Sequence, residues 1–501
     1  MDERCIPVLV GAGQCTKKYF EPIEELEPLV MLAETARRAA EDSGGGDRLL
    51  QAIDRVSLVF VRSWDYQNLP RLLAEKLGAH AKEEITTTAG GQTPQWLVNQ
   101  AARDITAGKL SVVLLTGAES INARRKAEKA GIEIPWSSGG SEAPLVLGKA
   151  GNPGFNDYER DYGLWSPVYI YPLFENAWRA HHKLDIGPHR EKLGRLFSPF
   201  TKVAAQNPYA WFQESLTPEE LITPTADNRM ISFPYTKKLI AILDVNQAAS
   251  VIMTSVSAAR SFGIPEDRWV YWWGGHEAVE DPWFVSERPR FHVCEAMVNV
   301  ANTTLESAGV TIDEIDFIDL YSCFPCAVQI ACDSLGIEAD DDRPLTVTGG
   351  LPYHGQPGTN YSTHAIATMM DKLRAAPGTK GYVGGNGMYL SKQSAGVYST
   401  EPKEPSSGTV AAKPKTPSQG PAPEMVREAE GRGFIETYTV IYDRENQPVR
   451  GIIIGRLDDG RRFIAHTPED RPLLEGLMES EAVGRAGKVT NKDGLNLFDL
   501  E

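Results

Sequence analysis

Four short segments of this chain hold the residues with the clearest capacity for chemistry. The segment Tyr321-Ser322-Cys323-Phe324-Pro325-Cys326 combines a phenol, which can exchange a proton, with two thiols in Cys-x-x-Cys spacing. Thioredoxin-like proteins activate a thiol with this spacing at the start of a helix. The alternative is that both cysteines pack as small apolar residues where a buried helix begins.

The other three segments are rich in glycine. Gly90, Gly91 and Thr93 precede an amphipathic stretch and are predicted to open a helix, whose first N–H groups can receive a carbonyl oxygen or another polar group. Gly385-Asn386-Gly387 is predicted to form a loop with the same capacity, and Gly355-Gln356-Pro357 is a third turn. The alternative is that these glycines only make tight turns.

The elements that must position these segments are apolar runs alternating with amphipathic stretches. This alternation predicts an α/β fold with a largely parallel sheet that is covered on both faces. Residues 84–105 and 316–335 both run strand, turn, helix, which suggests two similar halves. The expected buried strands are residues 5–11, 56–61, 111–115 and 317–320, and the expected helices are residues 29–40, 95–107 and 298–308.

The C-terminal part has a different pattern. Six prolines lie among polar and small residues in the segment 401–423, which predicts an extended linker. Residues 433–440, 451–457 and 462–466 then read as short strands separated by turn signals. They predict a small, separate, all-β barrel of about 70 residues.

Composition excludes several classes of function. The 501 residues include 51 basic and 67 acidic side chains, and the net charge of -16 argues against nucleic acid or an anionic membrane as the main partner. The sequence has no apolar run of the roughly 20 residues that a spanning helix needs. Its start lacks the features of a signal peptide, and six cysteines make no disulfide framework. A soluble cytoplasmic protein is therefore expected.

Several motifs resemble, in order and spacing, the thiolase superfamily and its SCP2-thiolase/thiolase-like protein (type 1) branch. Thr116-Gly117-Ala118-Glu119-Ser120 and Asp244-Val245-Asn246-Gln247-Ala248-Ala249 are similar to two elements of its first half. Gly349-Gly350 precedes Gly355-Gln356-Pro357 as a double glycine precedes Gly-His-Pro in the family. The resemblance covers roughly residues 5–400 and implies a thiolase fold: two related βαβαβαββ halves, five αβαβα layers and a loop-domain insertion.

The resemblance also implies domain boundaries, and it marks the C-terminal barrel as similar to OB-type folds. The expected domains are residues 1–121 with 239–262 for the N-terminal half, 122–238 for the loop domain, 263–400 for the C-terminal half, 401–425 for the Pro-rich linker and 426–501 for the barrel.

The residues that perform the thiolase reaction are replaced. The resemblance puts the nucleophilic cysteine at Gly90, the second cysteine at Val383 and the Gly-His-Pro histidine at Gln356. The loop that is Asn-Glu-Ala-Phe or His-Asp-Cys-Phe in the family reads Tyr321-Ser322-Cys323-Phe324, and this match favours packing over redox chemistry for its cysteines. Although the family consists of acyltransferases, ordinary thiolase activity is not expected here, because ping-pong acyl transfer needs a nucleophile and a base.

The first expected function is a non-catalytic protein of lipid metabolism that binds coenzyme A (CoA) or acyl-CoA, the ligand that the resemblance implies. The helix start at Gly90, Gly91 and Thr93 and the loop Gly385-Asn386-Gly387 would hold the thioester, with His354 nearby. Arg124 and Arg125 would meet the phosphates, although a charge run is more often a solvated face.

The second expected function is an aldolase-type carbon–carbon lyase, or an acyltransferase, that acts on an acyl-CoA. Some superfamily members without the nucleophile are retro-aldolases that work with a separate partner carrying an OB-type barrel. Tyr321, with Tyr353 or His354, would be the acid/base, and Gln356 occupies the neighbouring active-site loop. The alternative is that Tyr321 only fills space and hydrogen-bonds locally. No cofactor or metal is expected to be required; a protein partner at the barrel, a monomer and a homodimer all stay open.

Overall fold

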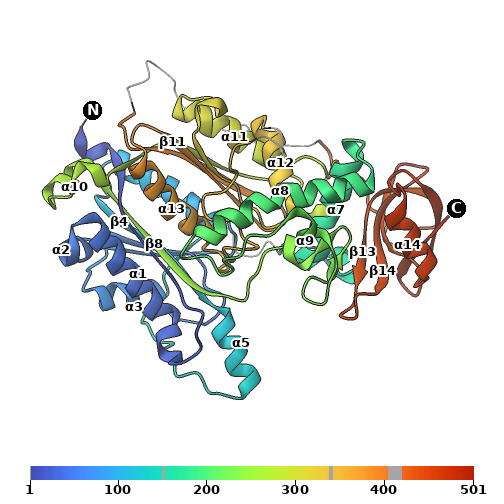
Figure 1. Cartoon of the computed structure of the whole chain (residues 1–501), viewed down its shortest axis with the longest axis horizontal. Coiled ribbons are helices and arrows are strands. Elements are labelled where there is room, and N and C mark those ends of the chain that lie inside the picture. The colour runs from blue at the N-terminus through green and yellow to red at the C-terminus, as the bar shows by residue number, and fades with distance from the viewer. Residues whose placement is uncertain (1, 149–152, 338–341, 404–419) are drawn as a thin grey trace.

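A ten-stranded mixed sheet and a C-terminal barrel form the frame of the molecule (Figure 1). The computed structural model describes residues 2–148, 153–337, 342–403 and 420–501. The strand order of the large sheet is β10-β11-β12-β9-β1-β8-β4-β2-β3-β5. Its strands are β1 (Pro7–Thr16), β2 (Arg55–Leu58), β3 (Glu83–Thr87), β4 (Val112–Ser120), β5 (Leu145–Leu147), β8 (Asn246–Ser255), β9 (Val270–Val279), β10 (Phe317–Asp319), β11 (Lys380–Gly387) and β12 (Lys392–Ser399).

The helices arrange this sheet into five layers. The two half-sheets meet where β9 pairs with β1. Helices α4 and α13 contact strands of both halves and form the central layer, while α1 covers the first half and α11 the second. The helices of these layers are α1 (Pro28–Ser43), α2 (Gly46–Gln51), α3 (Leu69–Leu77), α4 (Thr93–Thr106), α10 (Val256–Ser261), α11 (Glu295–Ala308), α12 (Pro325–Leu335) and α13 (Tyr361–Ala375).

The expected strands and helices of this part are confirmed. Strands β4 and β8 are buried at every position, because helices cover both faces of the sheet and leave no room for alternation with polar residues. The alternation of apolar runs with amphipathic stretches therefore predicted the α/β class correctly, and the layers are those that the resemblance to thiolases implies. The expectation of a largely parallel sheet needs correction: four neighbouring pairs are parallel and five are antiparallel, because burial on both faces produces apolar runs whatever the strand direction.

The regular elements of the described residues between 122 and 238 are mostly helices. Their short strands β6 and β7 do not join the large sheet. Strand β5 also lies in this segment and does join the large sheet. The other helices and strands that begin here are α6 (Asp157–Asp161), α7 (Pro167–His181), α8 (Ile186–Gln206), α9 (Pro218–Ile222), β6 (Met230–Ser232) and β7 (Tyr235–Thr236), and α5 (Ile121–Ala130) leads into the segment.

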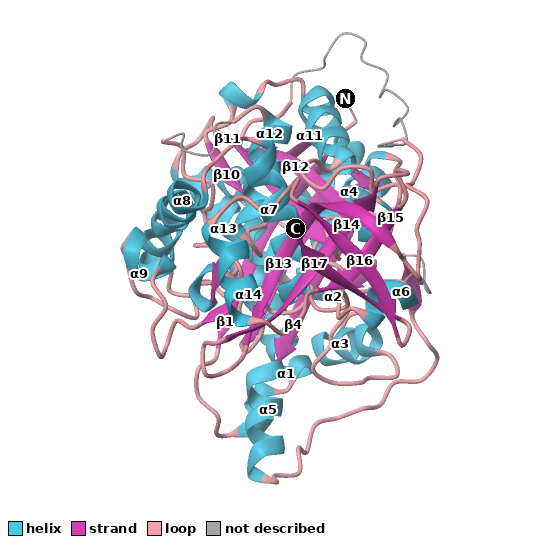
Figure 2. Ribbon diagram, turned by 90° about the vertical axis from the view of Figure 1, so that its right-hand side faces the viewer, coloured by secondary structure: helices cyan, strands magenta, loops and turns pink. Residues whose placement is uncertain are grey.

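The C-terminal strands close into a five-stranded barrel, in the order β14-β15-β17-β16-β13 with β13 pairing back to β14. Figure 2 looks onto this barrel, with β13 to β17 in front. The strands are β13 (Gly431–Tyr442), β14 (Pro448–Leu457), β15 (Arg462–His466), β16 (Ala486–Lys492) and β17 (Leu495–Leu500).

Two expectations about the barrel need correction. It is not purely β, because α14 (Arg471–Glu479) packs on β14 and buries Leu474 and Leu477. It is also not separate, because β6 pairs with β13 through Ser232 and Ile441. The barrel thus extends its sheet with strands that belong to the segment 122–238.

The remaining expectations concern the linker and membrane spans. Most of the Pro-rich segment, residues 404–419, lies outside the described residues. Among the described residues, no helix has both the length and the apolarity needed to cross a bilayer.

Candidate functional site

Tyr321 and Gly91 pack directly on one another where α4 begins. Tyr321 lies in the loop after β10, is 7% exposed, and contacts the ring of Tyr361 edge-on at 5.5 Å between centroids. A Cβ atom placed on Gly91 would lie 2.1 Å from the Tyr321 hydroxyl oxygen. Glycine at position 91 is therefore what allows the phenol to reach the start of the helix.

Gln92 fills the space beside Gly90. A Cβ atom on Gly90 would lie 2.3 Å from Gln92 Oε1, and one on Gly387 would lie 1.9 Å from the same oxygen. Gln92 Oε1 is buried and has no hydrogen-bond partner among the described residues. The space beside Gly90, to which the resemblance assigns the nucleophile, is thus occupied by the amide of Gln92.

Gly385, Asn386 and Gly387 belong to β11 and not to a loop, which corrects the sequence-based expectation. The hairpin pairing continues to Gly387 opposite Lys392, so the backbone of these residues is part of a strand ladder. The glycines that meet the start of α4 are Gly385 and Gly387. Val383 lies two residues earlier in the strand, opposite Gly396.

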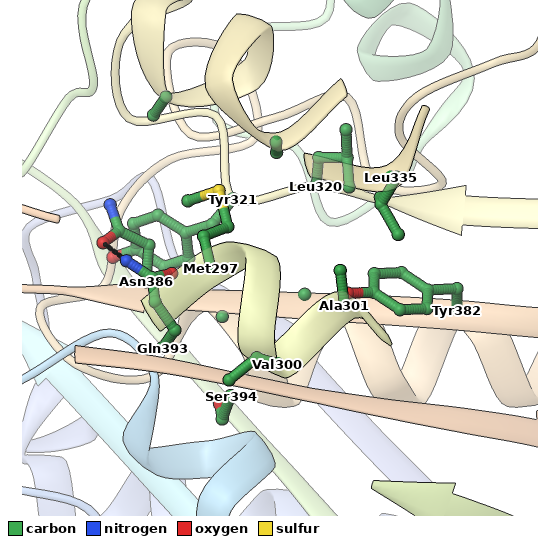
Figure 3. A pocket seen from close by; sticks show the side chains of 14 residues that line it. Met297, Val300, Ala301, Leu320, Tyr321, Leu335, Tyr382, Asn386, Gln393 and Ser394 are labelled. Carbon is green, nitrogen blue, oxygen red and sulfur yellow. Dashed lines mark hydrogen bonds between the residues drawn. The ribbon is translucent and has the colours of Figure 1, made fainter. Parts of the chain in front are cut away.

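Asn386 is held by hydrogen bonds inside the protein. Its Nδ2 donates to the Tyr171 hydroxyl at 3.0 Å, and its Oδ1 accepts from Gln393 Nε2 at 3.0 Å. Figure 3 shows Asn386, Gln393 and Tyr321 around a cavity between α11, α12 and β11. The cavity measures about 30 Å³, which is room for one water molecule and not for a thioester.

Gln356 is brought to Tyr321 as expected. Its Nε2 donates to the Tyr321 hydroxyl at 3.4 Å. Burial raises the pKa of Tyr321 far above the ordinary value of a phenol, so its neutral form is favoured. An amide cannot accept the phenol proton as a base would, and the pair therefore provides a proton donor without a base.

A buried carboxyl group holds the loop behind Tyr321. Asp319 accepts from the Tyr361 hydroxyl at 3.0 Å, from Thr346 Oγ1 at 2.9 Å and from the Val347 N–H at 2.9 Å. Burial raises its pKa to about 6. Asp319 therefore fixes Tyr361, against which the Tyr321 ring packs.

His354 and Tyr353 face the interior. His354 is fully buried, and its ring contacts His364 and Tyr361 edge-on at 4.8 and 5.8 Å between centroids. Burial lowers its pKa to about 4, so the imidazole is neutral. The hydroxyl of Tyr353 is also buried, and no described group hydrogen-bonds to it. The hydrogen bond to the Tyr321 hydroxyl comes from Gln356 and from neither of these side chains.

The remaining predicted residues have structural partners. Thr93 Oγ1 donates to the Gly90 carbonyl at 2.8 Å and closes the first turn of α4. Arg124 pairs with Glu128 at 2.8 Å, and Arg125 pairs with Asp244. Both arginines lie on α5, which projects away from the large sheet in Figure 1, and neither lines the cavity at Tyr321.

Cys323 and Cys326 are buried free thiols at the start of α12. Burial raises the pKa of Cys323 to about 12 and that of Cys326 well above its usual range. A redox or nucleophilic cysteine requires a stabilised thiolate, so packing accounts for both residues. Within the described ranges, no group of three or more histidine, cysteine or acidic side chains could hold a metal ion.

The sequence patterns did not identify Gln92 or Gln393 as site residues. Gln92 is the N-cap residue of α4 and Gln393 is the second residue of β12. The only signal was a glutamine between a double glycine and the helix, which does not reveal that the side chain folds back over Gly90.

Comparisons with known proteins agree with this fold. The family model described as "Thiolase-like protein type 1 additional C-terminal domain" matches residues 414–494. The crystal structure of a monomeric SCP2-thiolase like protein type 1 from Mycobacterium smegmatis is similar over 100% of both chains, with 36% sequence identity and a TM-score of 0.83.

Two further relatives are more distant. The structure of an Ltp2-ChsH2(DUF35) aldolase matches 79% of this chain and 97% of its own, with 18% identity and a TM-score of 0.61. An acetyl-CoA acetyltransferase of Methanothermobacter thermautotrophicus is 24% identical over 229 residues, which are 42% of this chain and 56% of that enzyme. The chain thus matches little more than half the length of this curated relative.

Proposed function

The chain belongs to the SCP2-thiolase-like proteins of type 1, and we propose that it is a non-catalytic member of lipid metabolism that binds CoA or acyl-CoA. The observation that carries the proposal is the filled catalytic centre. Gln92 and Tyr321 occupy the space beside Gly90 and Gly91. The positions around them provide neither a thiolate nor a base, and acyl transfer by a covalent route requires both.

The support for CoA comes from chemistry shared with relatives. The Methanothermobacter relative is named for a reaction on acetyl-CoA. The cavity of about 30 Å³ at Tyr321 does not admit a thioester, so CoA would bind on the outer surface of the protein. Arg124 and Arg125 are exposed cations that the phosphates of CoA could recruit from their carboxylate partners.

Titration calorimetry with CoA tests the binding proposal. Binding is expected at submillimolar concentration, and the Arg124→Gln/Arg125→Gln variant is expected to weaken it about tenfold through the loss of two phosphate contacts. Arg195→Gln is the matched control, because Arg195 also forms an exposed pair one helical turn from its glutamate. Absence of heat at millimolar CoA would remove the proposal.

A second candidate function rests on the position of the Tyr321 hydroxyl. It lies at the start of α4 and receives a hydrogen bond from Gln356. In a retro-aldol reaction a base removes the hydroxyl proton of a β-hydroxyacyl-CoA, the carbon–carbon bond breaks, and the enolate takes up a proton to give an acyl-CoA and a carbonyl compound. Because the described residues around Tyr321 provide no base, a water molecule would take the hydroxyl proton, while Tyr321 would give its own proton to the enolate and regain one from that water. The aldolase with the same fold is compatible with this candidate.

Mass spectrometry of a panel of β-hydroxyacyl-CoA compounds separates the two candidates. A lyase would produce shorter acyl-CoA, and Tyr321→Phe would lower the rate by about 100-fold or more. Turnover that survives Tyr321→Phe would exclude the tyrosine mechanism. Absence of turnover together with CoA binding is the result expected for the non-catalytic protein.

We propose that the chain is a monomer. The Mycobacterium relative is described as monomeric. In this chain β5 pairs with β3, so β3 is not free to pair with a second copy and the short β5 forms the edge instead. Light scattering should give a mass near 55.0 kDa, and a mass twice as large would overturn the proposal.

A further inference from the structure

A second and larger cavity lies next to the filled catalytic centre. It measures about 290 Å³ and opens between α4, the end of β9 and the start of β12. It shares Gln393 with the small cavity at Tyr321. Its wall includes Gln92, Trp96, Val279, Trp283, Lys392 and Gln393.

Lys392 brings a positive charge into this cavity without a carboxylate partner among the described residues. Its Nζ donates to the Ala89 carbonyl at a long 3.4 Å and lies 5.7 Å from the centre of the Trp283 ring. Burial lowers its pKa, because no neighbouring anion offsets the loss of water. A half-buried ammonium group in this state gains free energy from a bound anion.

The acidic side chain in the wall does not supply that anion. Glu277 forms hydrogen bonds with both terminal nitrogens of Arg103, at 2.5 and 2.9 Å, and also accepts from Gln100. Its charge is thus neutralised by Arg103. The cavity therefore has an excess of positive charge.

Gln92 brings a polar atom without a hydrogen-bond partner to this wall. Its side chain lines the cavity, the residue is 7% exposed, and its Oε1 is buried without a hydrogen bond from any described residue. A buried acceptor without a donor costs about 1–3 kcal/mol. A ligand hydroxyl group, or a water molecule held by the ligand, would satisfy it.

Apolar surface forms much of the rest of the wall. Trp96 and Trp283 are both half-buried, and Val279 is 52% exposed although it belongs to the cavity. Exposed apolar groups beside a few oriented polar groups are typical of small-molecule sites. The volume of about 290 Å³ limits the ligand to a small molecule.

We infer that this cavity binds a small organic carboxylate with a flat apolar body. The carboxylate accepts from Lys392, and the apolar body packs on Trp96, Trp283 and Val279. This site requires neither CoA nor a reaction, so it stands apart from the function proposed above. Its ligand class follows from the two indole rings and from the ammonium group, which has no carboxylate partner among the described residues.

Calorimetry on the full chain without CoA tests the inference, with 3-phenylpropanoate as the probe. The neutral 3-phenylpropanamide has the same shape and should bind about tenfold more weakly or worse, because it lacks the charge that Lys392 recognises. Acetate lacks the apolar body and should show no binding. Equal affinity for acid and amide, or no heat with either at millimolar concentration, would overturn the inference.

Variants locate the binding. Lys392→Met should weaken 3-phenylpropanoate about tenfold and leave the amide unchanged, while Lys392→Arg should keep the preference for the acid. Lys380→Met is the matched control, because Lys380 also lies over a tryptophan ring, 5.7 Å from the centre of Trp273, but outside the cavity. If Lys380→Met weakens the acid as much as Lys392→Met does, or if Lys392→Met has no effect, the site is not the one inferred.

Discussion

The Tyr321 hydroxyl oxygen lies 2.1 Å from the point at which a Cβ atom of residue 91 would stand. The phenol is wedged between Gly91 and the ring of Tyr361 and cannot move aside without losing that contact. We therefore expect Gly91→Ala to lower the free energy of unfolding by about 1–3 kcal/mol, as overpacking of a core does. Urea denaturation measures this change.

Tyr321→Ala is the partner variant for this prediction. Once the ring is removed, the added methyl group has room, and Gly91→Ala should cost less than about 0.5 kcal/mol in that background. The difference between the two costs is the coupling energy of the pair. Equal costs in both backgrounds would show that the steric contact does not limit residue 91.

The contact between Gly91 and Tyr321 also shows where prediction from sequence ends. Strands such as β4 and β8 were predictable because burial on both faces demands a continuous apolar run. Gly90 and Gly91 were predictable as a helix start. Tyr321 lies 230 positions further along the chain and fills the space above Gly91. This contact depends on how the two half-sheets pack, and such packing leaves no local pattern in the sequence.

The barrel illustrates the same limit. Its strands followed from alternation, but β6 pairs with β13 across 209 positions, from Ser232 to Ile441, and no turn signal marks that pairing. Helix α14 did carry a local signal, since Asp470 caps it and Leu474 and Leu477 share one face. This helix of nine residues was not predicted from the sequence, because the segments on both sides of it have the alternating pattern of strands.

Asp319 should make stability depend on pH. Its folded pKa of about 6 lies above the ordinary value of 3.8, so the folded state binds the proton more tightly than the unfolded state. The free energy of unfolding is therefore highest below about pH 4, where Asp319 is protonated in both states. It falls as the pH rises to about 6 and the buried carboxyl group loses its proton. The penalty above pH 6 is on the order of 3 kcal/mol.

Asp319→Asn should remove this dependence. The amide oxygen of the asparagine can accept from Thr346 and Val347, as the carboxylate does. Its Nδ2 can donate to the Tyr361 hydroxyl oxygen. The Tyr361 hydroxyl group can then donate its own proton to Thr348 Oγ1, which lies at 2.6 Å. Urea denaturation of both proteins at pH 4.5 and pH 7 measures it. We expect the variant to gain stability relative to the parent at pH 7; a difference that stays constant between the two pH values would contradict the assignment.

Arg462 should be the main anchor of the barrel. Its side chain is fully buried, pairs with Glu436 at 2.6 Å, and donates to the carbonyl groups of Ser286 and Arg288 at 2.8 and 2.6 Å. Arg462→Met removes the donor to both carbonyl groups and one of the two arginines that pair with Glu436, the other being Arg456, so we expect a loss of about 2–4 kcal/mol and faster proteolysis near residue 425. The control is Arg461→Met, since Arg461 pairs with Asp459 at the surface and should cost less than about 1 kcal/mol. Similar losses for both would show that Arg462 is not an anchor.

A thiol placed beside the start of α4 should become reactive once Gln92 is removed. A Cβ atom on Gly387 would lie 1.9 Å from Gln92 Oε1, and Gln92 separates this point from the cavity of about 290 Å³. In the Gly387→Cys/Gln92→Ala variant the thiol should open onto that cavity, and the N-terminus of α4 should lower its pKa. We expect iodoacetamide to label it faster at pH 7 than the buried native thiols of Cys323 and Cys326, as measured by peptide mass spectrometry.

The same variant tests why the parent chain lacks a nucleophilic site. Gly387→Cys alone should label slowly, because the amide of Gln92 covers the thiol. Even the unlabelled double variant, with its thiol free, should not gain thiolase turnover, because Gln356 still stands where a proton acceptor is needed and the cavity at Tyr321 still has room for one water molecule. Thiolysis of acetoacetyl-CoA by the double variant would show that Gln92 alone suppresses the reaction, and 3-phenylpropanoate should slow the labelling if it binds in the cavity beside Lys392.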